Sequence, residues 1–403
     1  MNRCRAEQIP GPNPFMKDAE FEPYRLKIEQ LAGLIRHHAD EAEANRYLNH
    51  EVAQAMASAG LYRVAAPRSI GGGEVHPSTQ IRVIEAVSEL DGAAGWNLII
   101  GIEVMGILAS IYPPELIKRL YADPGLIISG ALNPQGSAKR TDGGYLVSGR
   151  WPFASGIHNA HYFWGQCILR EDGEPVRDGQ GVVLIEALFS RDDFEIVDTW
   201  DVAGLRGSGS HDVKVDNLFV AEKLVSRASG NPGHERGTLY RLPLYSRLAY
   251  NKVGVATGIA RAAITSFKTL ATSKTPRGTV NKLRERTDAQ LAVAEAELRL
   301  GQARAYVMEA TNALWATVDR GDKPELEQRA RVHLACAGAV ADAVEVVAGL
   351  YTAAGASANF RSSPLEKHMR DIRVVPQHIM VSSQFTQAAG RVLLGLESGT
   401  FLF

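Results

Sequence analysis

Apolar residues recur three and four positions apart through most of the first 120 residues. This spacing predicts α-helices with one buried face, and it is clearest in residues 26–44 and 50–62. The segment 93–111 is apolar almost throughout, yet it carries Glu103, an asparagine and three glycines. We therefore expect a buried helix there rather than a membrane span, and we assign residues 1–124 to an N-terminal helical domain.

The pattern changes after residue 124. Short runs rich in β-branched and aromatic residues, such as 126–132, alternate with turns of Gly, Asp and Asn. The helical period returns at residue 237 in long Ala-rich segments, which are typical of antiparallel bundle helices. We predict an α+β fold that is mostly α, with a central β-barrel domain over 125–235 and a C-terminal four-helix bundle over 236–403.

Composition and charge narrow the class of partner. The 403 residues carry 44 basic and 45 acidic side chains, for a formal net charge of −1. No overall field attracts nucleic acid or an anionic membrane surface, so we expect neither as a partner. Cys4, Cys167 and Cys336 are odd in number and widely spaced, which indicates reduced thiols. Together with an N-terminus that lacks the apolar core of a secretory signal, they predict a cytoplasmic protein.

Several chemical motifs are missing from the sequence. It contains no G-x-G-x-x-G fingerprint, no P-loop and no G-x-S-x-G elbow, which argues against the usual nicotinamide-nucleotide site, nucleotide hydrolysis and serine hydrolase chemistry. His158 and His161 have an H-x-x-H spacing, but no Cys, Asp or Glu lies nearby to complete a metal site. We predict no metal.

Four segments, in this order and spacing, resemble one superfamily. Residues 143–156 (GGYLVSGRWPFASG) and 364–371 (PLEKHMRD) are similar to signatures of the acyl-CoA dehydrogenases. Residues 89–96 (ELDGAAGW) and 198–210 (DTWDVAGLRGSGS) resemble a branch of that superfamily, the two-component flavin-dependent monooxygenases. This branch includes oxygenase components of 4-hydroxyphenylacetate 3-hydroxylase and dibenzothiophene monooxygenase.

The resemblance implies both an activity and an assembly. The expected protein is an oxygenase component that takes reduced FMN or FAD from a separate NAD(P)H-dependent flavin reductase and reacts it with O2 to a C4a-hydroperoxyflavin. It would then oxygenate a small aromatic or heteroaromatic substrate, and it would assemble as a homotetramer. The choices between FMN and FAD, and between oxygenation at carbon, nitrogen or sulfur, stay open.

The same resemblance assigns two catalytic residues. Ser155 matches a hydroxyl that bonds flavin N5, and Phe153 would pack against the flavin ring. His378 matches a histidine beside the flavin C4a position, where a hydrogen-bond donor can assist oxygen transfer, and it would also face the substrate. The structural alternatives are a serine in a turn at the end of a strand and a histidine satisfied within the core.

Other expected contacts are spread over the chain. Trp96 would line the substrate cavity. The helix after it contains none of the histidines that deprotonate phenols in several relatives, so Glu103 is the substitute candidate, with exposure to solvent or pairing with arginine as the alternatives. The further residues that match cofactor-binding positions are Asn133, Ser137, Trp200, Ser208, Ser210, Lys274 and Arg277.

Two other functions stay open at this point. An acyl-CoA dehydrogenase needs a carboxylate base to remove a substrate proton, and the position that matches this base in most members is Ile379. Some dehydrogenases supply the base from another helix, so a dehydrogenase or related flavin oxidase is the alternative. A helical scaffold that has lost flavin is the third possibility.

Overall fold

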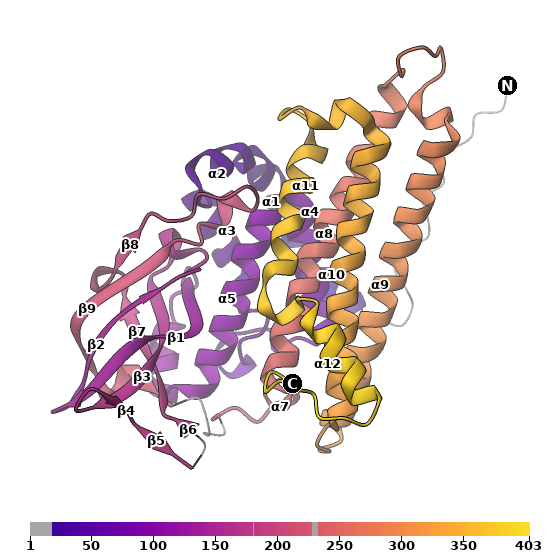
Figure 1. Cartoon of the computed structure of the whole chain (residues 1–403). Coiled ribbons are helices and arrows are strands. Elements are labelled where there is room, and N and C mark those ends of the chain that lie inside the picture. The colour runs from indigo at the N-terminus through magenta and orange to yellow at the C-terminus, as the bar shows by residue number, and fades with distance from the viewer. Residues whose placement is uncertain (1–17, 180, 228–232) are drawn as a thin grey trace.

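The computed structural model describes residues 18–179, 181–227 and 233–403. The chain passes from helices into a sheet and back into a helical bundle (Figure 1), which confirms the predicted fold class. The N-terminal helices are α1 (Asp18–His37), α2 (Ala39–Asn45), α3 (His50–Ser58), α4 (Pro77–Leu90), α5 (Gly92–Ile111) and α6 (Pro114–Leu120).

Helix α5 lies between the sheet and the bundle (Figure 1). Its N-cap Asp91 accepts the Ala94 N–H at 2.8 Å, which satisfies one of the free donors of the first helical turn. By length and composition, α5 and the segment 326–359 could each cross a membrane, but 83% of the α5 segment is buried inside the protein. This burial is typical of the central helix of a folded core.

The strands form one large, twisted sheet beside α5. Its order is β10-β7-β3-β1-β2-β9-β8, with β1 and β3 parallel and the other pairs antiparallel. Within the described residues the end strands β10 and β8 do not pair, so the sheet is open where a barrel was expected. Its strands are β1 (Ile128–Thr141), β2 (Gly144–Trp151), β3 (Tyr162–Glu171), β4 (Glu174–Pro175), β7 (Leu184–Ser190), β8 (Glu195–Val197), β9 (Asp212–Ala221) and β10 (Val225–Ser226). A separate hairpin joins β5 (Arg177–Asp178) to β6 (Gly181–Val182).

Three long helices dominate the C-terminal part. Helices α8, α9 and α10 lie side by side, and α11 and α12 complete this layer (Figure 1). Gly254 and Gly258 let α8 approach α4 closely, because a Cβ at either glycine would lie within 2.7 Å of an α4 carbonyl oxygen. The N-terminal helices and the bundle therefore share one core. The elements are α7 (Thr238–Arg241), α8 (Leu244–Ser273), α9 (Thr287–Asp319), α10 (Leu326–Ala354), α11 (Pro364–Val374) and α12 (Gln384–Leu393).

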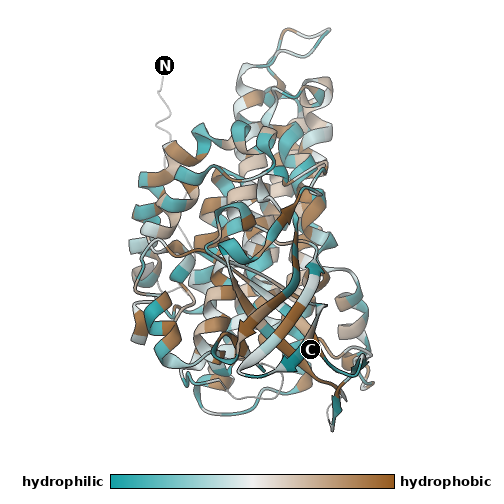
Figure 2. Ribbon diagram, turned by 90° about the vertical axis from the view of Figure 1, so that its left-hand side faces the viewer, coloured by the Kyte–Doolittle hydropathy of each residue, from teal (hydrophilic) through white to brown (hydrophobic). Residues whose placement is uncertain are grey.

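Burial follows the sequence pattern in both layers. Figure 2 shows mixed teal and brown residues on the outer helices and long brown stretches along the strands. Cys167 and Cys336 are free, and burial raises the pKa of both thiols well above its ordinary value, so neither is a reactive thiolate. Cys4 lies outside the described residues.

Candidate active site

A chain of three hydroxyl groups lies where β2 ends. The Oγ atoms of Ser155 and Ser210 are 2.6 Å apart, and those of Ser210 and Ser208 are 2.8 Å apart. Trp96 Nε1 of α5 donates to Ser155 Oγ at 3.0 Å. All three serines are buried. If each hydroxyl donates along the chain toward Ser155, the Ser155 hydrogen stays available for a ligand.

Backbone contacts hold this chain of hydroxyls in place. Gly156 N–H donates to the Ser208 carbonyl at 2.9 Å, and Ala154 N–H donates to the His211 carbonyl at 3.0 Å. The loops after β2 and before β9 are thus joined directly, although they are about fifty residues apart in the sequence. The positions of Ser155 and Ser210 are set by the main chain rather than by side-chain packing alone.

Phe153 and Trp200 form an aromatic pair next to the hydroxyls. Their rings meet edge to face, with centroids 6.3 Å apart. Phe153 has a φ of +65°, a strained region for a residue with a side chain, and its ring is 66% exposed. A strained backbone that presents an aromatic ring is typical of a surface made for a ligand rather than for the core.

His378 lies against Trp96, the tryptophan that donates to Ser155. It lies between two short 3₁₀ turns, η9 (Val375–Gln377) and η10 (Ile379–Val381), and its ring centroid is 5.8 Å from that of Trp96. Its Nδ1 accepts the Met380 N–H at 3.2 Å, so the neutral ring carries its proton on Nε2. Burial, reinforced by the charge of Lys252, holds the pKa of His378 well below its ordinary value of 6.5. His378 is therefore a neutral hydrogen-bond donor at neutral pH.

Glu103 is part of a buried ion pair. Both of its carboxylate oxygens lie within 2.6 Å of Lys252 Nζ on α8, and the two residues are 7% and 1% exposed. Burial raises the pKa of Glu103 and lowers that of Lys252, while each charge opposes the shift of the other. Of the alternatives considered from the sequence, exposure to solvent does not hold; the ion-pair partner of Glu103 is Lys252, and the charge of Arg247 also acts to lower the pKa of Glu103. Lys252 was missed, although it is the only charged residue between Arg247 and Arg261.

Asn133 lies where β1 leaves its regular pairing, and Ser137 lies just after this point, paired with Ile168 of β3 and Ser148 of β2. The register of β1 against β3 shifts between Ala131 and Gly136, so the intervening backbone bulges out of the sheet. Asn133 Oδ1 accepts a hydrogen bond from Gln135 Nε2 at 3.1 Å, and both Asn133 and Ser137 are partly exposed. The bulge leaves the polar group of Asn133 accessible to a ligand, whereas Ser137 is partly exposed from the regular strand.

Comparison with known proteins identifies the family of this chain. The families described as "Acyl-CoA dehydrogenase, N-terminal domain" and "Acyl-CoA dehydrogenase, C-terminal domain" match residues 29–113 and 251–383. The chain is 30% identical over 356 residues to the indole-3-acetate monooxygenase of Pseudomonas putida, an alignment that covers 88% of this chain and 89% of that protein. It is 26% identical to the oxygenase subunit HsaA of a Rhodococcus jostii flavin-dependent monooxygenase, with 86% and 91% covered. The chain belongs to the flavin-dependent monooxygenases of the acyl-CoA dehydrogenase superfamily.

A solved structure supports the fold of this family member. XiaF from Streptomyces sp., in complex with FADH2 and glycerol, superposes with a TM-score of 0.87 at 22% identity, and 95% of this chain and 97% of that chain are covered. The match extends through the helices, the sheet and the bundle. The expected assignment to the superfamily and to its monooxygenase branch is confirmed.

The family signature in α11 connects the bundle to the start of α5 and to the loop before β9. Lys367 Nζ contacts Asp91 at 2.8 Å and Asp371 at 2.6 Å, and Asp371 also accepts the Leu205 N–H at 2.6 Å. Burial alone would lower the pKa of Lys367, but the two carboxylates raise it well above its ordinary value. Three sequence motifs of this monooxygenase therefore converge on one charged cluster at the start of α5.

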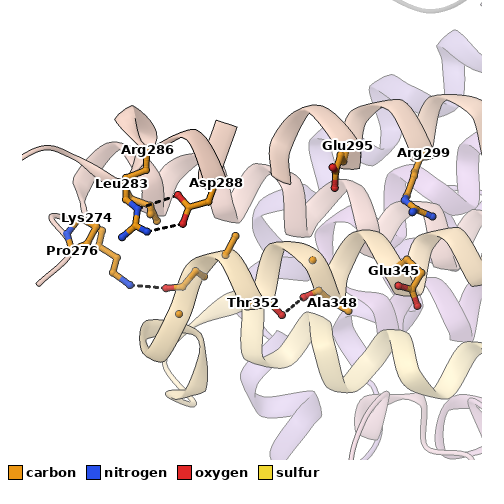
Figure 3. Close-up of a pocket in the computed structure, with 14 residues that line it drawn as sticks. Lys274, Pro276, Leu283, Arg286, Asp288, Glu295, Arg299, Glu345, Ala348 and Thr352 are labelled. Atoms are coloured by element: carbon orange, nitrogen blue, oxygen red, sulfur yellow. Dashed lines mark hydrogen bonds and ion pairs between the residues drawn. The ribbon is translucent and has the colours of Figure 1, made fainter. Parts of the chain in front are cut away.

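Lys274 lines a separate pocket of about 710 Å³ between the α8–α9 connection and the end of α10 (Figure 3). Its Nζ donates to the Ala354 carbonyl at 2.6 Å. Arg286 and Arg299 line the same pocket, whereas Arg277 does not. Of the two predicted basic residues, only Lys274 lines this pocket. Sequence reasoning missed the two arginines because Arg286 directly precedes α9 and Arg299 lies within it, away from Lys274 in the sequence.

The H-x-x-H histidines have other contacts. The His158 ring stacks on Tyr47, with centroids 4.2 Å apart. The His161 Nδ1 accepts the Ile127 N–H at 3.2 Å. Among the described residues no group of three or more His, Cys, Asp or Glu side chains could hold a metal ion.

Proposed function

We propose that this chain is the oxygenase component of a two-component monooxygenase. The carrying observation is that Trp96 donates a hydrogen bond to Ser155 and meets the His378 ring edge to face, so one indole side chain joins a hydroxyl to a neutral imidazole. Reduced flavin supplies the activation of O2 in such enzymes. The chain carries no nicotinamide fingerprint, which supports delivery of reduced flavin by a separate NAD(P)H-dependent reductase.

The donor groups suit a flavin. Phe153 offers an exposed aromatic side chain, Ser155 offers a hydroxyl hydrogen, and β1 offers the polar groups of Asn133 in its bulge and Ser137 just after it. Trp200, Ser208 and Ser210 would border the ring through the joined loops. The pocket around Lys274 would hold a flavin phosphate. In a homotetramer, this phosphate would belong to the flavin bound by a neighbouring subunit. FADH2 in XiaF supports FAD without excluding FMN.

The residues of this chain have distinct roles in the proposal. Ser155 would donate its hydroxyl hydrogen in a hydrogen bond to flavin N5, and His378 would donate from Nε2 toward the reacting oxygen. Trp96 is buried and contacts both groups, so it would help to exclude water from them. A substrate with an aromatic or heteroaromatic ring is supported by the relative named indole-3-acetate monooxygenase. The cytoplasmic location remains a prediction.

The dehydrogenase alternative finds no free base at the family position, Ile379, nor at Glu103, the carboxylate considered as a base for the substrate. Ile379 is 54% exposed but cannot take a proton, and Glu103 is held by Lys252. A dehydrogenase base must be a carboxylate free to accept the substrate proton. These two positions favour the oxygenase over the dehydrogenase.

Reconstitution tests the proposal. The purified protein is mixed with a flavin reductase, NADH, FAD or FMN, and indole-3-acetate or other small aromatic compounds, and product and hydrogen peroxide are measured. We expect oxygenated product that depends on reduced flavin and O2. Tight binding of oxidised flavin that is bleached by an acyl-CoA thioester, without oxygenation of any aromatic compound, would overturn it.

A further inference from the structure

The loop before β9 is attached to helix α11 at three consecutive residues. Arg370 Nη1 donates to the Ala203 carbonyl at 2.6 Å, and Asp371 Oδ1 accepts the Leu205 N–H at 2.6 Å. Between these two contacts, Gly204 lies so close to α11 that a Cβ there would stand 2.1 Å from the Arg370 carbonyl oxygen. Because only a residue without a side chain fits such an approach, the loop is docked on α11 through its backbone.

Leu205 connects this attachment to the candidate active site. Its N–H donates to Asp371, while its carbonyl accepts the Trp200 Nε1–H at 3.2 Å and the Ser208 N–H at 2.9 Å. Trp200 in turn meets Phe153 edge to face, and Ser208 is the first of the three joined hydroxyls. One residue therefore links α11 to both the aromatic pair and the chain of hydroxyls.

The backbone of Leu205 is strained. Its φ is +50°, a region that residues with a side chain rarely adopt because Cβ crowds a carbonyl oxygen. The side chain is 1% exposed, so this is not a turn at the surface. A strained conformation persists only where the surrounding contacts hold it. Asp371 holds the N–H of Leu205, so its loss would let the strain relax and turn the carbonyl away from Trp200.

Asp371 is itself fixed by an ion pair. Its Oδ2 lies 2.6 Å from Lys367 Nζ, which also contacts Asp91 at 2.8 Å. The carboxylate therefore has one oxygen for Lys367 and the other for Leu205. If Asp371 is removed, Lys367 still has Asp91 as its partner, so no buried charge is left alone. Replacing Asp371 by alanine thus tests the hydrogen bond to the loop.

We propose that Asp371 is a positioning residue for Trp200: by holding the strained Leu205 backbone on α11, it keeps the indole edge against Phe153. Asp371 is buried and acts through Leu205. The consequence for flavin binding rests on the proposed function. The position of Trp200 rests on the contacts of this chain alone, so the two parts can fail separately.

Two variants break the contact between Asp371 and Leu205 from opposite sides. Asp371→Ala removes the acceptor, and Gly204→Ala pushes the loop from α11 without changing any charge. Acrylamide quenching of tryptophan fluorescence in flavin-free protein reports the exposure of Trp200, taken as the difference between each protein and its Trp200→Phe counterpart. We expect the quenching constant of Trp200 to rise in both variants. Gly33→Ala, whose new Cβ would meet nothing within 4 Å, is the matched control and should equal the wild type.

Flavin affinity gives a second readout. Reduced FMN and reduced FAD are titrated anaerobically into wild type, Asp371→Ala, Trp200→Phe and the double variant. We expect Asp371→Ala to weaken binding roughly fivefold, as for the loss of one hydrogen bond. In the Trp200→Phe background the indole N–H is already gone, so the same change should have a much smaller effect. A purely structural role of Asp371 predicts equal losses in the two backgrounds.

The outcomes separate the two parts. Unchanged quenching of Trp200 in Asp371→Ala and Gly204→Ala would overturn the proposal, and so would an equal rise in Glu297→Gln, which breaks an ion pair between α8 and α9. If Asp371→Ala does not fold, Gly204→Ala decides, because it keeps the charged cluster. If Trp200 responds but no protein binds reduced flavin, the proposed function fails and the positioning role stands. Equal losses of flavin affinity in both backgrounds would overturn the link to flavin.

Discussion

The candidate active site has a sheet side, with Ser155, Ser208 and Ser210, and a helix side, with Glu103 and Lys252. The two sides stabilise their buried polar groups in different ways. On the sheet side, Ser155, Ser208 and Ser210 are neutral and form one continuous chain of hydrogen bonds. On the helix side, Glu103 and Lys252 are charged and buried. A neutral chain loses little when one member is removed, whereas a lone buried charge is costly. The helix side should therefore be the more sensitive of the two.

The largest expected effect comes from breaking the ion pair. Lys252→Met leaves Glu103 buried without a partner, and we expect a loss of about 3 to 5 kcal/mol in the free energy of unfolding. Ser210→Ala on the sheet side should cost only about 1 kcal/mol. Urea denaturation of both variants at neutral pH measures the contrast. Equal losses would remove the distinction between the two sides.

The same contrast explains what the sequence could predict. Ser155, Phe153 and Ser210 lie in contiguous motifs, because a β-strand and its following turn bring sequence neighbours to one place. The fold class also follows from local periodicity and motif order. The pairs Trp96–His378 and Glu103–Lys252 join three distant elements, and no local pattern encodes which helix faces meet.

Lys252 left only a faint signal. A single lysine in an apolar helical stretch indicates a buried partner, but it does not identify that partner. The open sheet was likewise not predictable, since strand patterns specify which faces are buried and not whether the end strands pair. Arg286 and Arg299 lie near Lys274 only because the chain reverses direction between α8 and α9, which no local pattern predicts.

A second effect on the helix side depends on pH. His333 is buried between Phe385 and Phe403, and burial lowers its pKa to about 4 from 6.5. The unfolded chain binds the proton first, so stability that is complete above pH 6.5 is lost as the pH falls toward 4. His333→Leu should remove about 2 kcal/mol of the loss seen between pH 7.5 and 5.0.

Urea denaturation at the two pH values tests this. The control is His37→Gln on the exposed surface of α1, which should leave the pH dependence of the wild type unchanged. A pH dependence of stability that is the same in His333→Leu and the wild type would show that this imidazole does not control the acid sensitivity of the helical side.

On the sheet side the expected effect is on coupling rather than on stability. Ser155→Ala removes the hydroxyl that Trp96 and Ser210 share, and the loss of one hydrogen bond of about 1 to 1.5 kcal/mol corresponds to a roughly tenfold rise in hydrogen peroxide released per product. Ser208→Ala, at the far end of the chain of hydroxyls, is the matched control and should change this ratio much less. Unchanged coupling in Ser155→Ala would remove Ser155 from the mechanism.

The smallest expected effect tests whether the site extends beyond these two sides. Lys274 lines the pocket at the end of α10, but its Nζ is already bonded to the Ala354 carbonyl, so a flavin phosphate would gain only the modest attraction of a partly solvated charge. We expect Lys274→Ala to weaken flavin binding about three- to fivefold, in line with about 0.5 to 1 kcal/mol for an exposed ion pair.

Arg277→Ala, which alters the same loop outside the pocket, is the control and should leave flavin affinity unchanged. Because salt screens such a contact, the difference between the two variants should shrink as ionic strength rises. Equal flavin affinity in both variants at low salt would confine cofactor binding to the sheet and helix sides that Trp96 joins.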